Sequence, residues 1–202
     1  PAGLRVQAAH RGDDDHLEAL VTVVFGEWRL VHRLDRDTSG VVLFARNERA
    51  LNAHLDAAFK QGTAHKAYLA LVAGGLSDED TLHDYLERDP QRSDQMRVVA
   101  KGGKLALTDV KLLGESDGVQ LLRLMPRTGR THQLRVQLAS RGAPILGDRL
   151  YGDAASAPRL MLHAARLVLP EGEGIAAAVF EAMVGDDFAG RVPAGLREIA
   201  AI

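Results

Sequence analysis

The sequence contains no cysteine among its 202 residues. A disulfide framework and a cysteine-ligated zinc site are therefore both excluded, and we expect a cytoplasmic protein that keeps its fold without disulfide bonds. The eight histidines are scattered and lack the short paired spacing that helical zinc sites use. We therefore expect no bound metal.

Long apolar runs are also missing. No stretch approaches the roughly 20 apolar residues that a membrane-spanning helix needs, and the chain opens on Pro1 to Gly3 rather than on a secretory leader. An initiating methionine is absent as well. We expect a protein that does not enter a membrane, a single monomeric domain over 1–202, and an N-terminus truncated before Pro1.

Charge is nearly balanced, with a formal net charge of −2. Its distribution is uneven, because the window 123–149 holds six arginines and one acid, giving +5 there and −7 in the remainder. A basic face on an otherwise acidic protein is the electrostatic footprint expected for a large anion such as RNA. The alternative is that these arginines only solubilise a helix and a loop.

The order of predicted elements indicates an α+β fold with a mixed sheet, because strands outnumber helices and do not alternate regularly with them. Apolar spacing predicts helices over 17–25, between Asn47 and Gly62, from Thr131 to 139, and over 193–202. Strands are expected over 41–45, 64–72, 105–113, 119–124, 160–169 and 176–184. The polar segment 77–103 is expected to be an irregular insertion with short strand pieces such as 96–99.

Segment 31–40 reads Val-His-Arg-Leu-Asp-Arg-Asp-Thr-Ser-Gly and precedes the apolar run 41–45. Hydroxyl side chains and glycine favour a turn, and the β-branched run favours a buried strand. Asp35 is therefore expected on a loop whose base is anchored in the core, an arrangement that holds a reactive group still and leaves it accessible. The alternative is a surface turn in which Asp35 and Asp37 pair with Arg33 and Arg36.

The run His-Arg-Leu-Asp-x-x-Thr-Ser-Gly resembles the catalytic motif of the RluA-type pseudouridine synthases. Three further segments resemble motifs of that family in the same order, and together they cover the chain from Pro1 to about Pro170. They are Pro1-Ala2-Gly3-Leu4, the strand 65–72 with Tyr68, and the arginine motif 126–136 followed by Pro144-Ile145-Leu146-Gly147-Asp148 and Tyr151-Gly152. The chain departs from the family at Gln137, where histidine is usual, and after Leu169-Pro170.

The resemblance implies a pseudouridine synthase fold, with a mainly antiparallel sheet, flanking helices and a central RNA-binding cleft, and an isomerase that needs no cofactor. It implies that Asp35 is the catalytic carboxylate, acting either as a nucleophile at C1′ or as the base that removes the C2′ proton. Tyr68 would stack on the target base and handle a proton. Arg135 would keep Asp35 charged, its planar guanidinium able to hold both carboxylate oxygens.

The same resemblance implies that the target nucleotide is flipped out of a folded RNA, from tRNA or large-subunit rRNA. Arg33 would insert beside it. The residues expected to hold RNA phosphates are Arg127, Arg130, Thr131, His132 and Arg141. His32 and Gln133 are expected to be structural and to bond loop backbone.

Two other readings remain open from the residues alone. A non-catalytic RNA-binding module would use the same arginines and make no demand on Asp35. A hydrolase would use Asp35 as general base with His32 as its partner.

Overall fold

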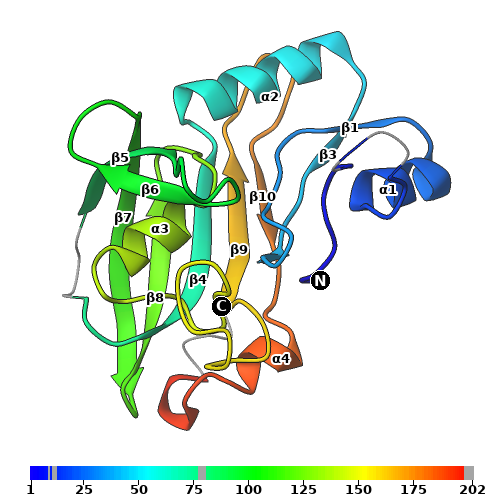
Figure 1. Ribbon diagram of the computed structural model, residues 1–202. Helices are drawn as coiled ribbons and strands as arrows, with labels where there is room; N and C mark the ends of the chain where they lie inside the picture. The colour runs from blue at the N-terminus through cyan, green and yellow to red at the C-terminus, as the bar shows by residue number, and fades with distance from the viewer. Residues whose placement is uncertain (9, 11–12, 77–80, 198–202) are drawn as a thin grey trace.

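An eight-stranded sheet forms the centre of the molecule (Figure 1). The computed structural model describes residues 1–197 apart from 9, 11–12 and 77–80. Along the sheet the strands follow the order β10-β9-β4-β8-β7-β5-β6, every neighbouring pair is antiparallel, and β2 adds a short parallel pairing with β9. The predicted α+β class with a mixed, mainly antiparallel sheet is confirmed.

The elements alternate without a regular βαβ repeat. The strands are β1 (Trp28–Leu30), β2 (Ser39–Gly40), β3 (Phe44–Arg46), β4 (His65–Ala73), β5 (Thr81–Arg88), β6 (Met96–Val99), β7 (Lys104–Ser116), β8 (Val119–Pro126), β9 (Leu162–Leu169) and β10 (Ala178–Glu181). The helices are α1 (Leu17–Phe25), α2 (Arg49–Gln61), α3 (Gln133–Ala139), α4 (Asp186–Ala189) and a 3₁₀ turn at Ala194–Leu196.

The main core surrounds β4 and β8. Leu71, Val72 and Leu121 are fully buried there, and α3 adds Leu138, while Phe188 comes from the C-terminal segment. A second cluster forms where α2 packs through Leu55 and Ala58 on Leu167 and Leu169 of β9. Figure 1 shows α2 above the sheet, with α3 and the β5–β6 strands on one side and β1, β3 and α1 on the other.

The apolar run 41–45 does not form the one buried strand that was predicted. Ser39–Gly40 pairs with β9, the chain then leaves the sheet, and Phe44–Arg46 pairs with β1 in a separate two-stranded sheet. Val41 and Leu43 pack on the α2 cluster, whereas Val42 packs on the cluster around Leu34. The run is apolar because it lies between two clusters, and its composition therefore mimics a strand.

The segment 77–103 was predicted to be an irregular insertion, and this is wrong for most of it. β5 pairs with β7 and β6 and extends the main sheet, with Leu82 and Leu86 buried. The strand piece 96–99 is confirmed as β6, and 77–80 lie outside the described residues. Charged side chains on the exposed face of β5 hide its alternation. The hairpin of β7 and β8 is confirmed, with a tighter turn at Asp117-Gly118, both at positive φ.

Several predicted helix details also differ. Asn47 does not cap α2, whose N-cap is Glu48, and Thr131 does not cap α3, whose N-cap is His132. The apolar side chains of α1 are largely exposed, with Phe25 69 % exposed. Of the predicted terminal helix only a 3₁₀ turn falls in the described part, and 198–202 lie outside it. No helix among the described residues is both long and apolar enough to span a membrane.

His32 anchors the loop that carries Asp35. Its Nε2 accepts a hydrogen bond of 3.2 Å from the Leu43 amide, and its ring stacks on Phe59 of α2 with centroids 5.3 Å apart. Burial, with the Lys66 ammonium nearby, lowers the pKa of His32 from its ordinary 6.5 to about 4. Its predicted structural role is confirmed.

Acid should therefore weaken this anchor. Above pH 6.5 the ring is neutral in both states; between pH 6.5 and 4 only the unfolded chain takes up the proton, so the free energy of unfolding falls by up to about 3 kcal/mol. Urea titrations across this range should show a shallower loss for His32→Gln, which stays neutral and keeps an acceptor. Identical pH profiles for the two proteins would contradict this assignment.

Candidate active site

The loop that carries Asp35 is fixed at both ends. The Thr38 amide donates a 3.0 Å hydrogen bond to the Asp35 carbonyl, and Ser39–Gly40 then pairs with β9 at His163–Ala164. Gly40 has φ 118°, and a Cβ there would overlap the Ala164 backbone. Only glycine permits this close approach, so the Ser-Gly of the motif is what docks the loop on the sheet.

Tyr68 reaches the same place from β4. It pairs with Ala164 at a bulge in the β4–β9 ladder, so the Asp35 loop and Tyr68 meet on one residue of β9. Leu34 and Val6 pack beside Tyr68 in a small cluster. Burial, with the negative charge of Asp35, raises the pKa of Tyr68 well above its ordinary value, so its hydroxyl remains protonated at neutral pH.

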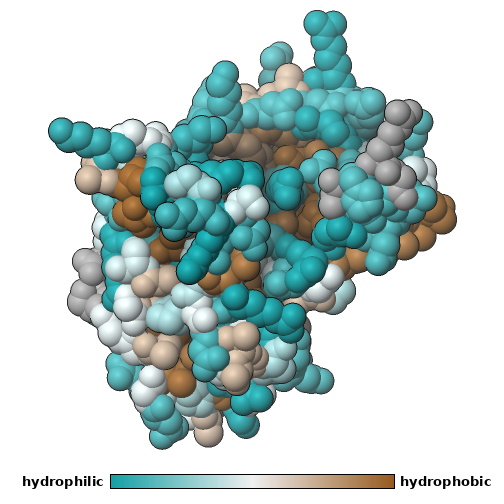
Figure 2. Space-filling model, viewed as in Figure 1, coloured by the Kyte–Doolittle hydropathy of each residue, from teal (hydrophilic) through white to brown (hydrophobic). Residues whose placement is uncertain are grey.

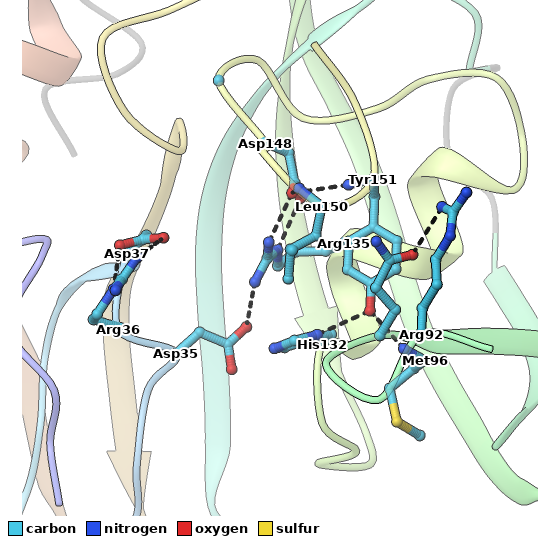
Figure 3. Close-up of polar contacts among 12 residues, drawn as sticks. Asp35, Arg36, Asp37, Arg92, Met96, His132, Arg135, Asp148, Leu150 and Tyr151 are labelled. Atoms are coloured by element: carbon cyan, nitrogen blue, oxygen red, sulfur yellow. Dashed lines mark hydrogen bonds and ion pairs between the residues drawn. The ribbon is translucent and has the colours of Figure 1, made fainter. Parts of the chain in front are cut away.

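Arg135 lies between two carboxylates (Figure 3). Its Nε and Nη2 donate hydrogen bonds of 2.8 and 2.7 Å to Asp148, and its Nη1 lies 3.5 Å from Oδ2 of Asp35. The side chain of Asp148 is fully buried and that of Arg135 is 5 % exposed, whereas that of Asp35 is 28 % exposed. The predicted two-oxygen grip on Asp35 is wrong, because Asp148 takes the bidentate face of the guanidinium and leaves one nitrogen for Asp35.

Asp148 is held in place by its own backbone surroundings. Its Oδ1 accepts hydrogen bonds from the amides of Leu150 and Tyr151 at 2.9 and 3.2 Å. Burial alone would raise the pKa of Asp148, but the hydrogen bonds from Arg135 hold it below its ordinary value. Asp148 is therefore a permanent countercharge that orients Arg135 toward Asp35.

A second network holds His132 at the edge of the site. The Tyr151 hydroxyl accepts from the Met96 amide at 2.7 Å and lies 2.8 Å from Nδ1 of His132. The hydroxyl has one proton and two lone pairs, so besides accepting from Met96 it either donates to Nδ1 or accepts from it, according to the imidazole tautomer. Burial lowers the pKa of His132, which favours the neutral imidazole. The Tyr151 ring also lies beneath the Arg135 guanidinium, whose Cζ is 5.2 Å from the centroid of that ring.

These groups surround a pocket of about 370 Å³. Figure 2 shows that this face is hollowed below α2, with hydrophilic side chains around the hollow. The structure brings seven of the nine predicted site residues to this pocket: Arg33, Asp35, Tyr68, Arg130, Thr131, His132 and Arg135. Arg127 lines the neighbouring pocket and pairs with Asp109. Arg141 pairs with Asp84 and lies away from the Asp35 pocket.

The structure settles three other expectations from the sequence. Gln133 bonds loop backbone, accepting from the Arg130 amide and donating to the Leu107 carbonyl, which confirms its structural role. Gln137, the departure from the family pattern, is fully buried and joins α3 to Asp84 and Thr108. His32 accepts a hydrogen bond from the Leu43 amide and stacks on Phe59. The hydrolase alternative, in which His32 assists Asp35, therefore lacks its histidine partner.

Sequence reasoning gave no role to Asp148 or Tyr151. A signal for Asp148 was present, because it is the one acid in a window of six arginines. Tyr151 had no such signal, since its contacts come from Met96 and His132 and depend on tertiary structure. Within the described part of the chain, no group of three or more His, Asp or Glu side chains is placed to hold a metal ion.

Comparison with known proteins agrees with this geometry. A sequence model of the family described as RNA pseudouridylate synthase matches residues 1–140. The chain belongs to this family. Similar proteins include a ribosomal large subunit pseudouridine synthase D and a dual-specificity RNA pseudouridine synthase RluA, so the chain is an isomerase that acts on RNA.

Three proteins illustrate the similarity. An uncharacterized RNA pseudouridine synthase of Zymomonas mobilis is 39 % identical over 172 residues, which cover 81 % of this chain and 78 % of that protein. Ribosomal large subunit pseudouridine synthase D of Borreliella burgdorferi is 38 % identical over 71 % of this chain, which spans only 45 % of that relative. Human RNA pseudouridylate synthase domain containing 1 superposes with a TM-score of 0.76 at 28 % identity, over 93 % of this chain and 80 % of that one.

Replacing Asp148, the buried countercharge of Arg135, should distinguish its effect on the orientation of Arg135 from its effect on folding stability. Asp148→Asn leaves the guanidinium without its charged partner, so the free energy of unfolding should fall by about 3 to 5 kcal/mol. In protein kept folded at low temperature, kcat for isomerisation should also fall, because Arg135 no longer faces Asp35 in a fixed orientation.

Asp84→Asn is the matched control, since Asp84 pairs with Arg141 away from the Asp35 pocket. It should lower stability and leave kcat unchanged. Equal kcat in folded Asp148→Asn and in the unsubstituted protein would restrict Asp148 to a stabilising role.

Proposed function

We propose that this chain converts specific uridines in structured RNA to pseudouridine with Asp35 as its catalytic carboxylate. The observation that carries the proposal is the ion contact of 3.5 Å between Asp35 and Arg135 in a pocket that Tyr68 also lines. Arg135 presents a positive charge to Asp35 in this pocket, and Asp148 orients the guanidinium by accepting hydrogen bonds from its Nε and Nη2.

The reaction breaks the bond between N1 of the base and C1′ of the ribose, turns the base, and joins C1′ to C5. The proton on C5 is then lost and N1 gains one, so the product is an isomer and no redox step is involved. Asp35 acts at the sugar, by attack on C1′ or by removal of the C2′ proton. Tyr68 stacks on the base, and its hydroxyl, which is protonated in the free protein, relays the C5 proton by passing its own proton to water as it accepts the one from C5.

A uridine inside a folded RNA reaches this pocket only after it is flipped out of its stack. Arg33 is exposed at the rim beside Leu34 and is placed to enter the space that the nucleotide leaves. Arg130, Thr131 and His132 line the opposite wall and are available to RNA phosphates. Arg141 is left out of this set because Asp84 already pairs with it.

The RNA classes we propose are large-subunit ribosomal RNA and transfer RNA. One relative is named a ribosomal large subunit synthase, and a 38 % identical relative from Vibrio cholerae is named a dual-specificity RNA pseudouridine synthase. The compact length and segment 157–164, which follows Tyr151-Gly152, resemble short synthases that modify stem-loops of tRNA and matching loops of large-subunit rRNA, and this resemblance supports both targets.

Release of tritium from C5 tests the reaction directly. Unmodified tRNA and rRNA transcripts labelled at uridine C5 should lose label to water with the unsubstituted protein and none above background with Asp35→Asn, because only the isomerisation frees that hydrogen without cutting the chain. Equal RNA binding by both proteins with no release from either would instead favour a non-catalytic RNA-binding module.

Tyr68→Phe separates stacking from proton transfer. The ring is kept and the hydroxyl is lost, so single-turnover release should slow by about a hundredfold, within the usual range for general acid–base catalysis, while the Kd for RNA stays the same. If the two proteins release label at the same rate, Tyr68 acts by stacking alone.

A further inference from the structure

A second pocket, of about 480 Å³, adjoins the Asp35 pocket on the side of α2. We call it the flanking pocket. Among the described residues its lining holds no carboxylate and five cationic side chains: Arg33, Lys60, Lys66, Arg127 and Arg130. The pocket on the other side of Asp35 differs, because Asp35, Asp37 and Asp94 line it together with its arginines. The charge around Asp35 is thus asymmetric.

Lys66 is the unusual member of this set. Burial lowers its pKa, yet no ion pair or hydrogen bond to its ammonium is formed by the residues that the structure describes. Its Nζ lies 6.0 Å from the Phe59 ring centroid, and a Cβ added at Gly129 would come within 3.5 Å of it. A half-buried cation without a countercharge costs free energy in the free protein, and an anion in the pocket would remove that cost.

The two pockets are continuous. Lys66 and Tyr68 are two residues apart on β4, so they share a face of the strand, and both line both pockets. Arg33 and Arg130 are shared as well. A nucleotide held over Asp35 therefore has its neighbour in the strand directed toward Lys66.

The aromatic side chains that line the flanking pocket are Tyr68, which it shares with the Asp35 pocket, and the stacked pair His32 and Phe59. Phe59 is stacked by His32 on one side and approached by Lys66 at 6.0 Å. Lys60, in the last turn of α2, is exposed and without an ion pair among the described residues. The concentration of cationic side chains suits the phosphate backbone.

We propose that the flanking pocket is a subsite for the RNA backbone next to the target uridine, in which Lys66 and Lys60 bind phosphate without regard to sequence. The inference rests on the proposed function, because the substrate strand must pass over Asp35. It adds two lysines that the motif resemblance did not assign, and it fixes the side of the pocket from which the strand continues.

Binding can be measured without turnover in Asp35→Asn protein, with a short fluorescein-labelled oligouridylate over a range of salt concentrations. Lys60→Met and Lys66→Met should each reduce the slope of log K against log salt by about 0.7, the value for one phosphate contact on a single strand, and together by about twice that. Lys60 is exposed, so its replacement keeps the fold even if Lys66→Met does not.

Arg49→Met is the control, because Arg49 is an exposed cation at the opposite end of the same helix. It should leave the slope unchanged. The proposal would be overturned if Arg49→Met reduced the salt slope as much as Lys60→Met does, or if neither Lys60→Met nor Lys66→Met reduced it. Because the assay needs no isomerisation, a chain that binds in this way and releases no tritium would refute the proposed function and leave the subsite intact.

A single backbone substitution locates the contact. Methylphosphonate placed at one phosphate beside the target position should weaken binding to the protein with Lys66 and have little further effect on Lys66→Met. Additive effects at every phosphate would show that Lys66 contacts none of them, and would also overturn the proposal.

Discussion

The site depends on one buried guanidinium shared by two carboxylates of different exposure. Arg135 needs a countercharge in the interior, and the fully buried Asp148 supplies it through two short hydrogen bonds. Asp35 is therefore not the main countercharge of Arg135, and it makes one longer contact, 3.5 Å between Nη1 of Arg135 and Oδ2 of Asp35. A reactive carboxylate that also had to compensate the arginine would be held too tightly to reach a sugar.

Three segments that are distant in sequence meet because of β9. Its residue Ala164 pairs with Gly40 at the foot of the Asp35 loop and with Tyr68 of β4. Arg135 arrives on α3, and the buried Leu134 and Leu138 fix that short helix to the core. The proposed catalytic residues are thus positioned by strand pairing and core packing, which suits a site that must hold its geometry against a large substrate.

The sequence predicted the parts of this site whose signals are local. The turn at Thr38 to Gly40, the strand with Tyr68 and the helix with Arg135 each follow from their own residues. Asp148 stands out in the sequence as the one acid among six arginines, but which of these arginines it pairs with is decided only in the folded chain. β5 was missed for a different reason: its buried Leu82 and Leu86 are separated by polar residues that resemble a loop. The nine-residue α1 was found, but its exposed stripe shows that periodicity predicts a helix and not its burial.

The β5–β6 strands also bear on catalysis at a distance. The Met96 amide at the start of β6 is bonded to the Tyr151 hydroxyl, and Tyr151 in turn contacts both His132 and Arg135. Arg88, at the end of β5, reaches the rim of the Asp35 pocket. The β5–β6 strands therefore contribute both a side chain of the pocket, Arg88, and the amide that bonds to the Tyr151 hydroxyl beneath the Arg135 guanidinium.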